Sequence, residues 1–385
     1  MGKMIYLDNA ATTKTAPEVV EAMLPYFSEY YGNPSSIYAI AGKSKEAITK
    51  GREQIANVLG AKPEEIYFTA GGSESDNWAL KATFEAYKNK GNHIITTKIE
   101  HHAILHTCEY LEKERGAKIT YIGVDENGVV NLDELEAAIT PETILISVMA
   151  ANNEIGTIQP IKEIGRIAKE HNILFHTDAV QAFGQIPINV DECNIDMLSS
   201  SGHKINGPKG IGFLYIRKGV KIRSFVHGGA QERKRRAGTE NVPGIAGIGL
   251  AAKTIYTDLD EKVAHMRALK QHFIEGVQKI DHTVIHGLYD ETSAPHIISV
   301  GFAGIRSEVL LHTLEEKGIY VSSGSACASN HPAISGVLKG IGAGKEYLDA
   351  TLRFSMSEFT TEEEIDYTLE TLYNCVPMLR KYTRH

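Results

Sequence analysis

The chain has 385 residues, of which 42% are apolar and 23% are charged, and this composition is typical of two or three globular domains rather than of a disordered or disulfide-stapled protein. Its 40 basic and 48 acidic residues give a net charge of -8, and the longest basic run covers only residues 233–236, so a surface that wraps nucleic acid is not expected. No segment has the ~20 apolar residues of a membrane-spanning helix. The first residues also lack the pattern of a signal peptide. We therefore expect a cytoplasmic protein without direct membrane or nucleic-acid contacts.

The four cysteines, at positions 108, 193, 327 and 375, lie far apart and show no paired spacing. Such spacing suits a reducing compartment better than a disulfide framework. Each cysteine is therefore interpreted singly.

Short apolar runs alternate with helical patterns from residue 66 onward. The alternation predicts a mostly parallel sheet that is covered by helices on both faces. Strands are expected at residues 66–69, 93–97, 119–124, 144–149, 173–178, 197–199 and 211–216. Helices are expected at residues 74–90, 103–115, 132–139 and 161–171.

The last third of the chain has a different pattern. One helical pattern runs from about residue 244 to 280, and it is followed by strands at 297–300, 319–322 and 352–355 and by helices at 307–316 and from 362. This pattern predicts a smaller α+β unit. We expect a large domain over residues 15–255 and a small domain formed by residues 1–14 and 256–385, with a shared interface that commonly holds an active site.

Three local patterns point to chemistry, although each has an ordinary alternative. Residues 68–74 (FTAGGSE) form a strand end, two glycines and a helix start, which can bind phosphate or can simply be a helix cap formed by Ser73. Asp178 ends a strand where α/β sheets bind ligands, or it caps a turn. Lys204 follows small residues on a later strand, and most lysines are simply solvated. Together they supply what pyridoxal phosphate needs: a phosphate cradle, an acid for the ring nitrogen and a Schiff-base lysine.

Further motifs carry a resemblance to a known family. They are YLDNAATT at residues 6–13, GNPSS at 32–36, EHH at 100–102, NNEIG at 152–156, RAGT at 236–239 and SSGSAC at 322–327. With the Asp178 and Lys204 segments, they resemble the cysteine desulfurases of the NifS/IscS type, which belong to the class V aminotransferase-like, fold type I pyridoxal-phosphate enzymes. The resemblance extends from residue 4 to about residue 372.

The resemblance implies an α/β transferase of fold type I, with the cofactor in the large domain and a nucleophilic cysteine loop in the small one. The implied reaction converts L-cysteine to L-alanine and leaves the sulfur on an enzyme cysteine as a persulfide. A protein acceptor would then take that sulfur for iron-sulfur cluster biogenesis or tRNA thiolation, the acceptor being an iron-sulfur scaffold or a tRNA-thiolating enzyme.

The same resemblance implies roles for individual residues. Lys204 is similar to the Schiff-base lysine that also moves the substrate α-proton, and Asp178 to the acid at the pyridine nitrogen. His101 resembles the imidazole stacked on the cofactor ring, Gln181 the residue bound to the ring hydroxyl oxygen, and Arg353 the clamp for the substrate carboxylate. Asn153 is similar to a residue that orients the ring edge and the substrate. The implied phosphate contacts are Gly72, Ser73, Ser201, His203 and, from the neighbouring subunit of a homodimer, Thr239.

Cys327 is the implied nucleophile, in a loop of small residues at 322–329. Cys108, Cys193 and Cys375 fit small buried thiols better. No metal is expected, because His102 and His106 have the one-turn spacing of zinc ligands but no third ligand motif.

Some positions depart from the family pattern. Tyr38 stands where many relatives have His, Ser73 replaces the commoner Thr, and residues 330–335 (NHPAIS) differ from the usual stretch. Two enzymatic alternatives stay open at this point, selenocysteine lyase and aminotransferase activity on the same scaffold. A third alternative is a non-catalytic scaffold for a sulfur acceptor.

Overall fold

The computed structural model describes residues 4–323 and 334–382, and Cys327 lies outside the described residues. Its largest sheet has seven strands in the order β2-β8-β7-β6-β5-β3-β4. Neighbours from β7 to β4 run parallel, whereas β8 is antiparallel to both β7 and β2. The predicted mostly parallel sheet is thus confirmed. The strands are β2 (Ile66–Thr69), β3 (His93–Thr97), β4 (Lys118–Ile122), β5 (Thr143–Ser147), β6 (Leu174–Asp178), β7 (Met197–Ser201) and β8 (Gly212–Ile216).

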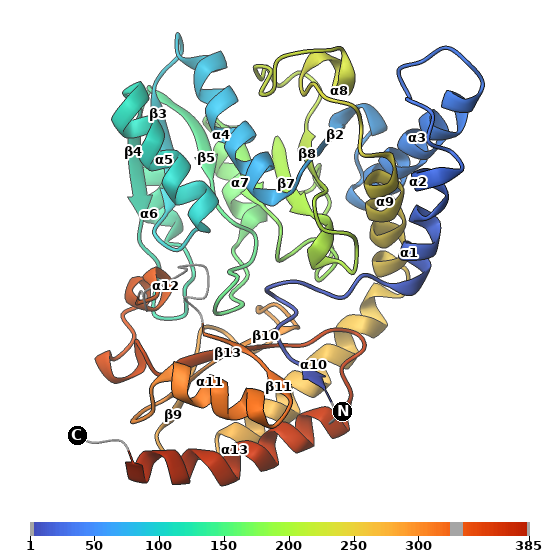
Figure 1. Cartoon of the computed structure of the whole chain (residues 1–385). Helices are drawn as coiled ribbons and strands as arrows, with labels where there is room; N and C mark the ends of the chain where they lie inside the picture. The colour runs from blue at the N-terminus through green and yellow to red at the C-terminus, as the bar shows by residue number, and fades with distance from the viewer. Residues whose placement is uncertain (1–3, 324–333, 383–385) are drawn as a thin grey trace.

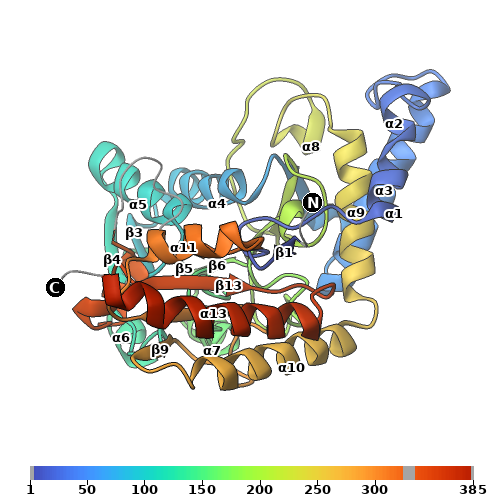
Figure 2. The same ribbon diagram turned by 60° about the horizontal axis from the view of Figure 1, so that its bottom comes forward.

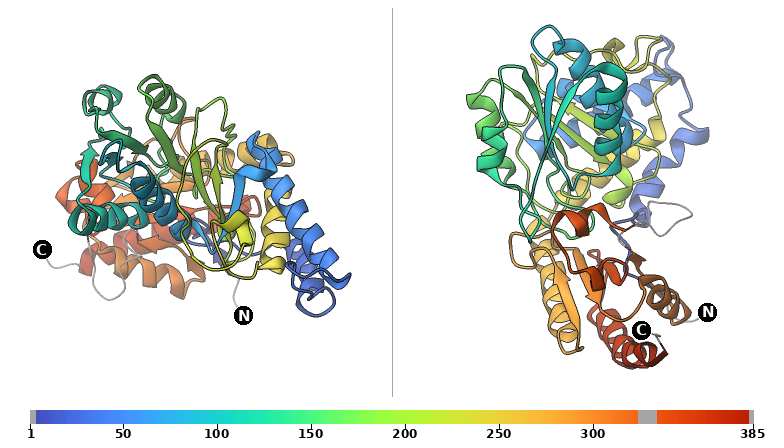
Figure 3. Two further views of the ribbon diagram at one scale, coloured as in Figure 1. Left: turned by 90° about the horizontal axis from the view of Figure 1, so that it is seen from above. Right: turned by 90° about the vertical axis from the view of Figure 1, so that its left-hand side faces the viewer.

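Helices cover both faces of this sheet (Figures 1 and 3). Successive residues of a strand point to opposite faces, and on β8 Phe213 packs into one buried cluster and Leu214 into another. Coverage on both sides explains why β5 and β7 are buried at every position. The first cluster includes residues of α3 (Ile40–Leu59), α7 (Ile161–Glu170) and α9 (Val242–Tyr256), and the second includes residues of α4 (Gly72–Tyr87) and α5 (His102–Arg115).

A second, antiparallel sheet of four strands has the order β12-β13-β10-β9 and is drawn in the lower part of Figure 1. Helices α10 and α13 run side by side along it in Figure 2. The short strand β1 pairs with β11, so the start of the chain joins the C-terminal part. These elements are β1 (Ile5–Tyr6), α10 (Leu259–Val277), β9 (Thr283–His286), β10 (Ile297–Phe302), α11 (Ser307–Glu316), β11 (Ile319–Tyr320), β12 (Ser322–Ser323), β13 (Thr351–Ser355) and α13 (Glu362–Tyr382).

The remaining helices are short. They are α1 (Pro17–Met23), α2 (Pro25–Ser28), α6 (Leu132–Ala137), α8 (Gln231–Lys234) and α12 (Gly336–Gly340), with 3-10 turns η1 (Pro63–Glu65), η2 (Gly202–Lys204) and η3 (Lys345–Tyr347). Within the described ranges, no helix combines the length and the apolar character needed to cross a bilayer.

Three local predictions were wrong. The helix expected from residue 244 to 280 is two helices, because α9 ends at Tyr256 and Asp258 takes a left-handed backbone conformation with φ of 58°. Lys204 does not lie on a strand, because β7 ends at Ser201 and η2 follows. Ser73 does not cap α4, whose N-cap residue is Gly71. The predicted domain boundaries near residues 15 and 255 stay a prediction.

Candidate active site

A pocket of about 360 Å³ lies between the seven-stranded sheet and the C-terminal part of the chain. Its volume is within the range of small-molecule sites, roughly 300–1,000 Å³. Strands β5, β6 and β7 bring their carboxyl ends to it, the edge where open α/β sheets bind ligands. The predicted site residues that line it are Gly72, Ser73, His101, Asn153, Asp178, Gln181, Ser201, His203, Lys204 and Arg353.

The first turn of α4 forms one end of the pocket. Gly72 and Ser73 stand at the N-terminus of this 16-residue helix, where backbone N–H groups and the helix dipole favour an anion. A Cβ atom at Gly72 would lie 2.7 Å from Cγ2 of Val180, so only a bare backbone fits there unless Val180 moves. His203 lies nearby, and burial lowers its pKa to about 4, which keeps the imidazole neutral near pH 7.

Lys204 reaches the pocket from the turn after β7. Its Nζ donates hydrogen bonds to the carbonyl oxygens of Ala10, at 2.5 Å, and Ala11, at 2.8 Å. The amine is therefore held against the N-terminal segment and next to the open volume of the pocket.

Asp178 and His101 define another side. Asp178 ends β6, is buried, and accepts a hydrogen bond of 2.9 Å from the Val180 N–H. Burial raises the pKa of Asp178, whereas His101, Val180 and Lys204 act in the opposite direction and favour its charged form. His101 is the N-cap of α5, and its Nδ1 accepts a hydrogen bond from the Ala103 N–H at 3.1 Å.

Arg353 lies on β13 and is 6% exposed. Its guanidinium donates to the backbone oxygen of Asn153 at 2.8 Å and to Oδ1 of Asp8 at 2.9 Å. Its Nε–H has no hydrogen-bond partner among the residues that the structure describes. A buried donor of this kind suits an added carboxylate.

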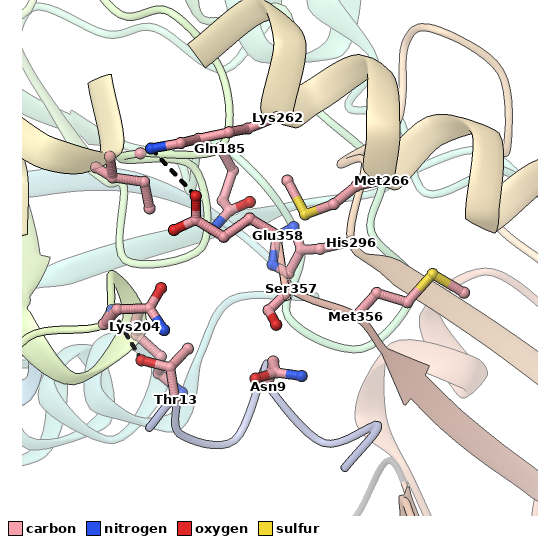
Figure 4. Close-up of a pocket in the computed structure, with 13 residues that line it drawn as sticks. Asn9, Thr13, Gln185, Lys204, Lys262, Met266, His296, Met356, Ser357 and Glu358 are labelled. Atoms are coloured by element: carbon pink, nitrogen blue, oxygen red, sulfur yellow. Dashed lines mark hydrogen bonds and ion pairs between the residues drawn. The ribbon is translucent and has the colours of Figure 1, made fainter. Parts of the chain in front are cut away.

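A second, smaller cavity also adjoins Lys204 (Figure 4). Only about 10 Å³ of it is open to a water-sized sphere, which leaves room for about one water molecule. It is therefore too small for a coenzyme, and the 360 Å³ pocket is the candidate reaction site.

The known proteins that this chain resembles agree in family. A family model described as "Aminotransferase class-V" matches residues 5–368. The chain belongs to the class-V aminotransferase family. It is 54% identical to "Cysteine desulfurase IscS" of Methanosarcina thermophila, with 98% of this chain and 93% of that protein covered. It is 51% identical to the protein of the same name from Clostridium botulinum, with 99% and 96% covered.

Solved structures agree with this assignment. A "NIFS-LIKE PROTEIN" superposes with a TM-score of 0.92 at 41% identity and covers 98% of this chain and 100% of that one. "SspA in complex with cysteine" has a TM-score of 0.81 at 37% identity, with 93% of this chain and 100% of that one covered. The resemblance, the fold type I architecture and the place among the pyridoxal-phosphate-dependent enzymes of the cysteine desulfurase group are thus confirmed.

The residues of the pocket fit pyridoxal phosphate. The bare backbone at Gly72 on a helix N-terminus suits the phosphate, the buried carboxyl of Asp178 suits a protonated ring nitrogen, and the Lys204 amine lies in the same pocket. The individual contacts stay a prediction.

One predicted site residue does not line this pocket, and another is not described by the structure. Thr239 is exposed on a surface loop and is not among the lining residues, and Cys327 lies outside the described residues. Tyr38 is 57% exposed and also lies away from the pocket. Of the other cysteines, Cys108 and Cys375 are buried as expected, but Cys193 is only half-buried. Burial raises the pKa of Cys108 to about 12 and that of Cys375 to about 11, so neither is a thiolate near neutral pH.

Two acids in the pocket were missed by the sequence analysis. Asp8 belongs to the motif at residues 6–13, but the sequence indicated no role for it. In the structure it pairs with Arg353. Asp76 was noticed only as a poor capping partner of Ser73, yet it is 1% exposed and lines the pocket. The signal for Asp76 was its place one turn into a helix whose same face carries Ala79, Leu80 and Thr83, all buried.

Proposed function

We propose that this protein is a cysteine desulfurase that takes sulfur from L-cysteine, leaves L-alanine and passes the sulfur to a protein acceptor. The observation that carries the proposal is that the Lys204 amine, the Asp178 carboxyl and the Arg353 guanidinium line a single pocket. These are groups for a coenzyme aldehyde, a ring nitrogen and an amino acid carboxylate. The 54% identical relative bears the name of the same activity.

In this proposal the chain supplies orientation and proton transfer. When bound, pyridoxal phosphate withdraws electrons from the α-carbon of an attached amino acid. Arg353 binds the substrate carboxylate beside Asp8 and thereby fixes the α-carbon over the pocket. The Lys204 amine, held by two carbonyl oxygens, moves the proton at that carbon. Asp178 would supply a negative charge for the ring nitrogen of the coenzyme, and His101 would relay protons beside the ring.

Cys327 is the proposed sulfur acceptor within the chain. Its thiolate attacks the substrate sulfur, so that an S–S bond forms, the substrate C–S bond breaks and the carbon fragment takes up protons to become alanine. Ser322 lines the pocket and pairs with Arg353 across β12 and β13. Five residues of extended chain span at most ~18 Å, so the length of the chain allows Cys327 to reach the substrate.

The test compares Cys327→Ala with Cys193→Ala, a matched change at a half-buried cysteine. We expect Cys327→Ala to keep the bound, coloured coenzyme and to lose alanine release from cysteine, whereas Cys193→Ala keeps both. Full turnover by Cys327→Ala would refute the assignment. A higher kcat/KM for selenocysteine than for cysteine would favour the lyase alternative, and amino transfer to a keto acid would favour the aminotransferase. A coloured wild-type protein without any turnover would favour the scaffold.

We also propose a homodimer that completes the site. Large apolar side chains are exposed on the segment from α1 to the start of α3, which projects from the rest of the molecule in Figures 1 and 2. Contiguous exposed apolar surface is typical of an interface. Thr239 lies outside its own pocket, as expected of a residue that serves a second copy. The exposed side chains include Leu24, Phe27, Tyr31, Ile37 and Tyr38.

Sedimentation of a Phe27→Glu, Tyr31→Glu double variant tests the dimer. We expect it to sediment as a monomer with weakened coenzyme binding, whereas Tyr289→Ser, at a residue 49% exposed elsewhere, should leave the dimer intact. A monomeric wild type would refute the shared site.

The sulfur acceptor is proposed as a class of protein, and the compartment is proposed from the state of the cysteines. We take the acceptor to be a protein thiol, on an iron-sulfur scaffold or a tRNA-thiolating enzyme, and we place the protein in the cytoplasm because Cys108, Cys193 and Cys375 form no disulfide. Transfer of labelled sulfur from loaded enzyme to a panel of both acceptor types would separate the two.

A further inference from the structure

Three buried carboxyl groups gather at the pocket: Asp76 and Asp178 line it, and Glu100 is close enough to act on the charge of Asp76. One oxygen of Asp76, one oxygen of Asp178 and one ring nitrogen of His101 all lie within 4.8 Å of one another. Two ionised carboxylates at this separation repel strongly when they are withdrawn from water. The Asp76–Asp178 pair should therefore hold one proton and carry one negative charge.

The surroundings decide which carboxyl is charged. Asp178 has a backbone N–H donor from Val180, and Lys204 and His101 favour its ionised form. His101 approaches both carboxyls, whereas the Val180 N–H and Lys204 favour the ionised form of Asp178. Burial raises the pKa of Asp76 well above its usual value, and the charges of Asp178 and Glu100 raise it further, against a weaker opposing hydrogen bond from Ser199. Burial also raises the pKa of Glu100, to about 8.

The hydrogen bonds around Asp76 favour the same assignment. Burial lowers the pKa of His176 to about 3, so its imidazole is neutral, with Ser147 and Ser199 hydroxyls each 2.9 Å from a ring nitrogen. Its Nε2 is 3.8 Å from Oδ1 of Asp76, which is too far for a hydrogen bond. That Oδ1 has no donor in the described part of the chain. An ionised Asp76 would leave this oxygen unsatisfied, whereas a protonated one becomes a donor itself.

We propose that Asp76 is a positioning residue. Its carboxyl stays protonated and donates a hydrogen bond toward Asp178, so the single negative charge of the pair stays on Asp178. The inference rests on the proposed function insofar as Asp178 serves the coenzyme nitrogen. A neutral Asp76 fixes the Asp178 carboxylate without competing with it for the positive charge of the ring.

The first test measures urea unfolding of the holoenzyme against pH for wild type, Asp76→Asn and Asp349→Asn, the last at an exposed acid. A folded pKa raised above the unfolded value means that wild type loses stability as pH rises between the two values, whereas Asn does not titrate. The ratio of the folding constants of Asp76→Asn and wild type should rise by about tenfold per pH unit in that window. Asp349→Asn controls for the removal of a carboxylate at the surface. A flat ratio for Asp76→Asn would overturn the proposal.

The second test follows the coenzyme and needs no turnover. Asparagine keeps a donor toward Asp178 and an acceptor for Ser199, so Asp76→Asn should retain the absorption spectrum and the coenzyme affinity of wild type. Asp76→Ala, which leaves Asp178 without that donor, should bind the coenzyme more weakly. Equal loss in both variants would contradict the proposal. A different outcome would separate the two proposals. If Asp76→Asn gives the expected rising ratio and the expected wild-type spectrum, but wild type releases no alanine, the proposed function is refuted and this inference stands.

Discussion

Replacement of Arg353 by Lys should lower kcat/KM for L-cysteine by about 10- to 100-fold. The guanidinium already donates to Asp8 and to the Asn153 carbonyl, and its buried Nε–H has no partner among the described residues. A lysine keeps the charge but has a single nitrogen, so it cannot serve both of these groups and a substrate carboxylate. A hydrogen bond to a charged group is worth ~1.5–3 kcal/mol, and each 1.4 kcal/mol is about tenfold in rate or affinity.

The assay is steady-state alanine formation over a range of cysteine concentrations, together with the coenzyme absorption spectrum as a check that the site is intact. Arg380→Lys is the matched control, because Arg380 on α13 also binds backbone carbonyls but lies away from the pocket. We expect the effect mainly in KM, since the arginine binds the part of the substrate that does not react. An unchanged kcat/KM in Arg353→Lys, or an equal loss in Arg380→Lys, would refute the role of the clamp.

Three further outcomes are expected. Lys204→Ala should lose the visible absorption of lysine-bound coenzyme after dialysis, and an unchanged spectrum would contradict its role. Burial raises the pKa of Glu154 to about 7 despite its bond to Ser335, so Glu154→Gln should gain up to about 3 kcal/mol over wild type as pH rises from about 4.5 to 7, measured by urea unfolding at both ends. Gly165→Ala should lower the melting temperature, because its Cβ would lie 1.8 Å from the Cys193 carbonyl oxygen; an unchanged melting temperature would show that α7 shifts freely.

The strands of the large sheet were predictable because their physical cause is local. A strand covered on both faces carries an apolar run without polar alternation, such as Ile144 to Ile146 in β5 and Ile173 to Phe175 at the start of β6. The break between α9 and α10 was not predictable, because Thr257 and Asp258 are neither glycine nor proline and the helical periodicity continues across them. Lys204 was placed on a strand because Ser199 to Ser201 fit a strand end and a turn equally well.

A shared coenzyme site for Ser73, Asp178 and Lys204 was suggested by their local patterns taken together, but the full set of site residues was predictable only from the resemblance. Ser73, Asp178 and Arg353 lie more than 100 residues apart in sequence, and no local pattern states that they share a pocket. The resemblance gave their roles but not the state of their neighbours. Asp76 is the example, because its protonation depends on the burial and charge of Asp178, which come from another element of the fold.

The N-terminal motif at residues 6–13 has a physical explanation in the structure. Its backbone carbonyl at Ala10 accepts from both Lys204 and Gln181, and its Asp8 carboxylate holds Arg353. The Ala10 N–H in turn donates to the Ser355 hydroxyl on β13 at 2.9 Å. This segment therefore links the coenzyme side of the pocket to the strand that carries the substrate clamp.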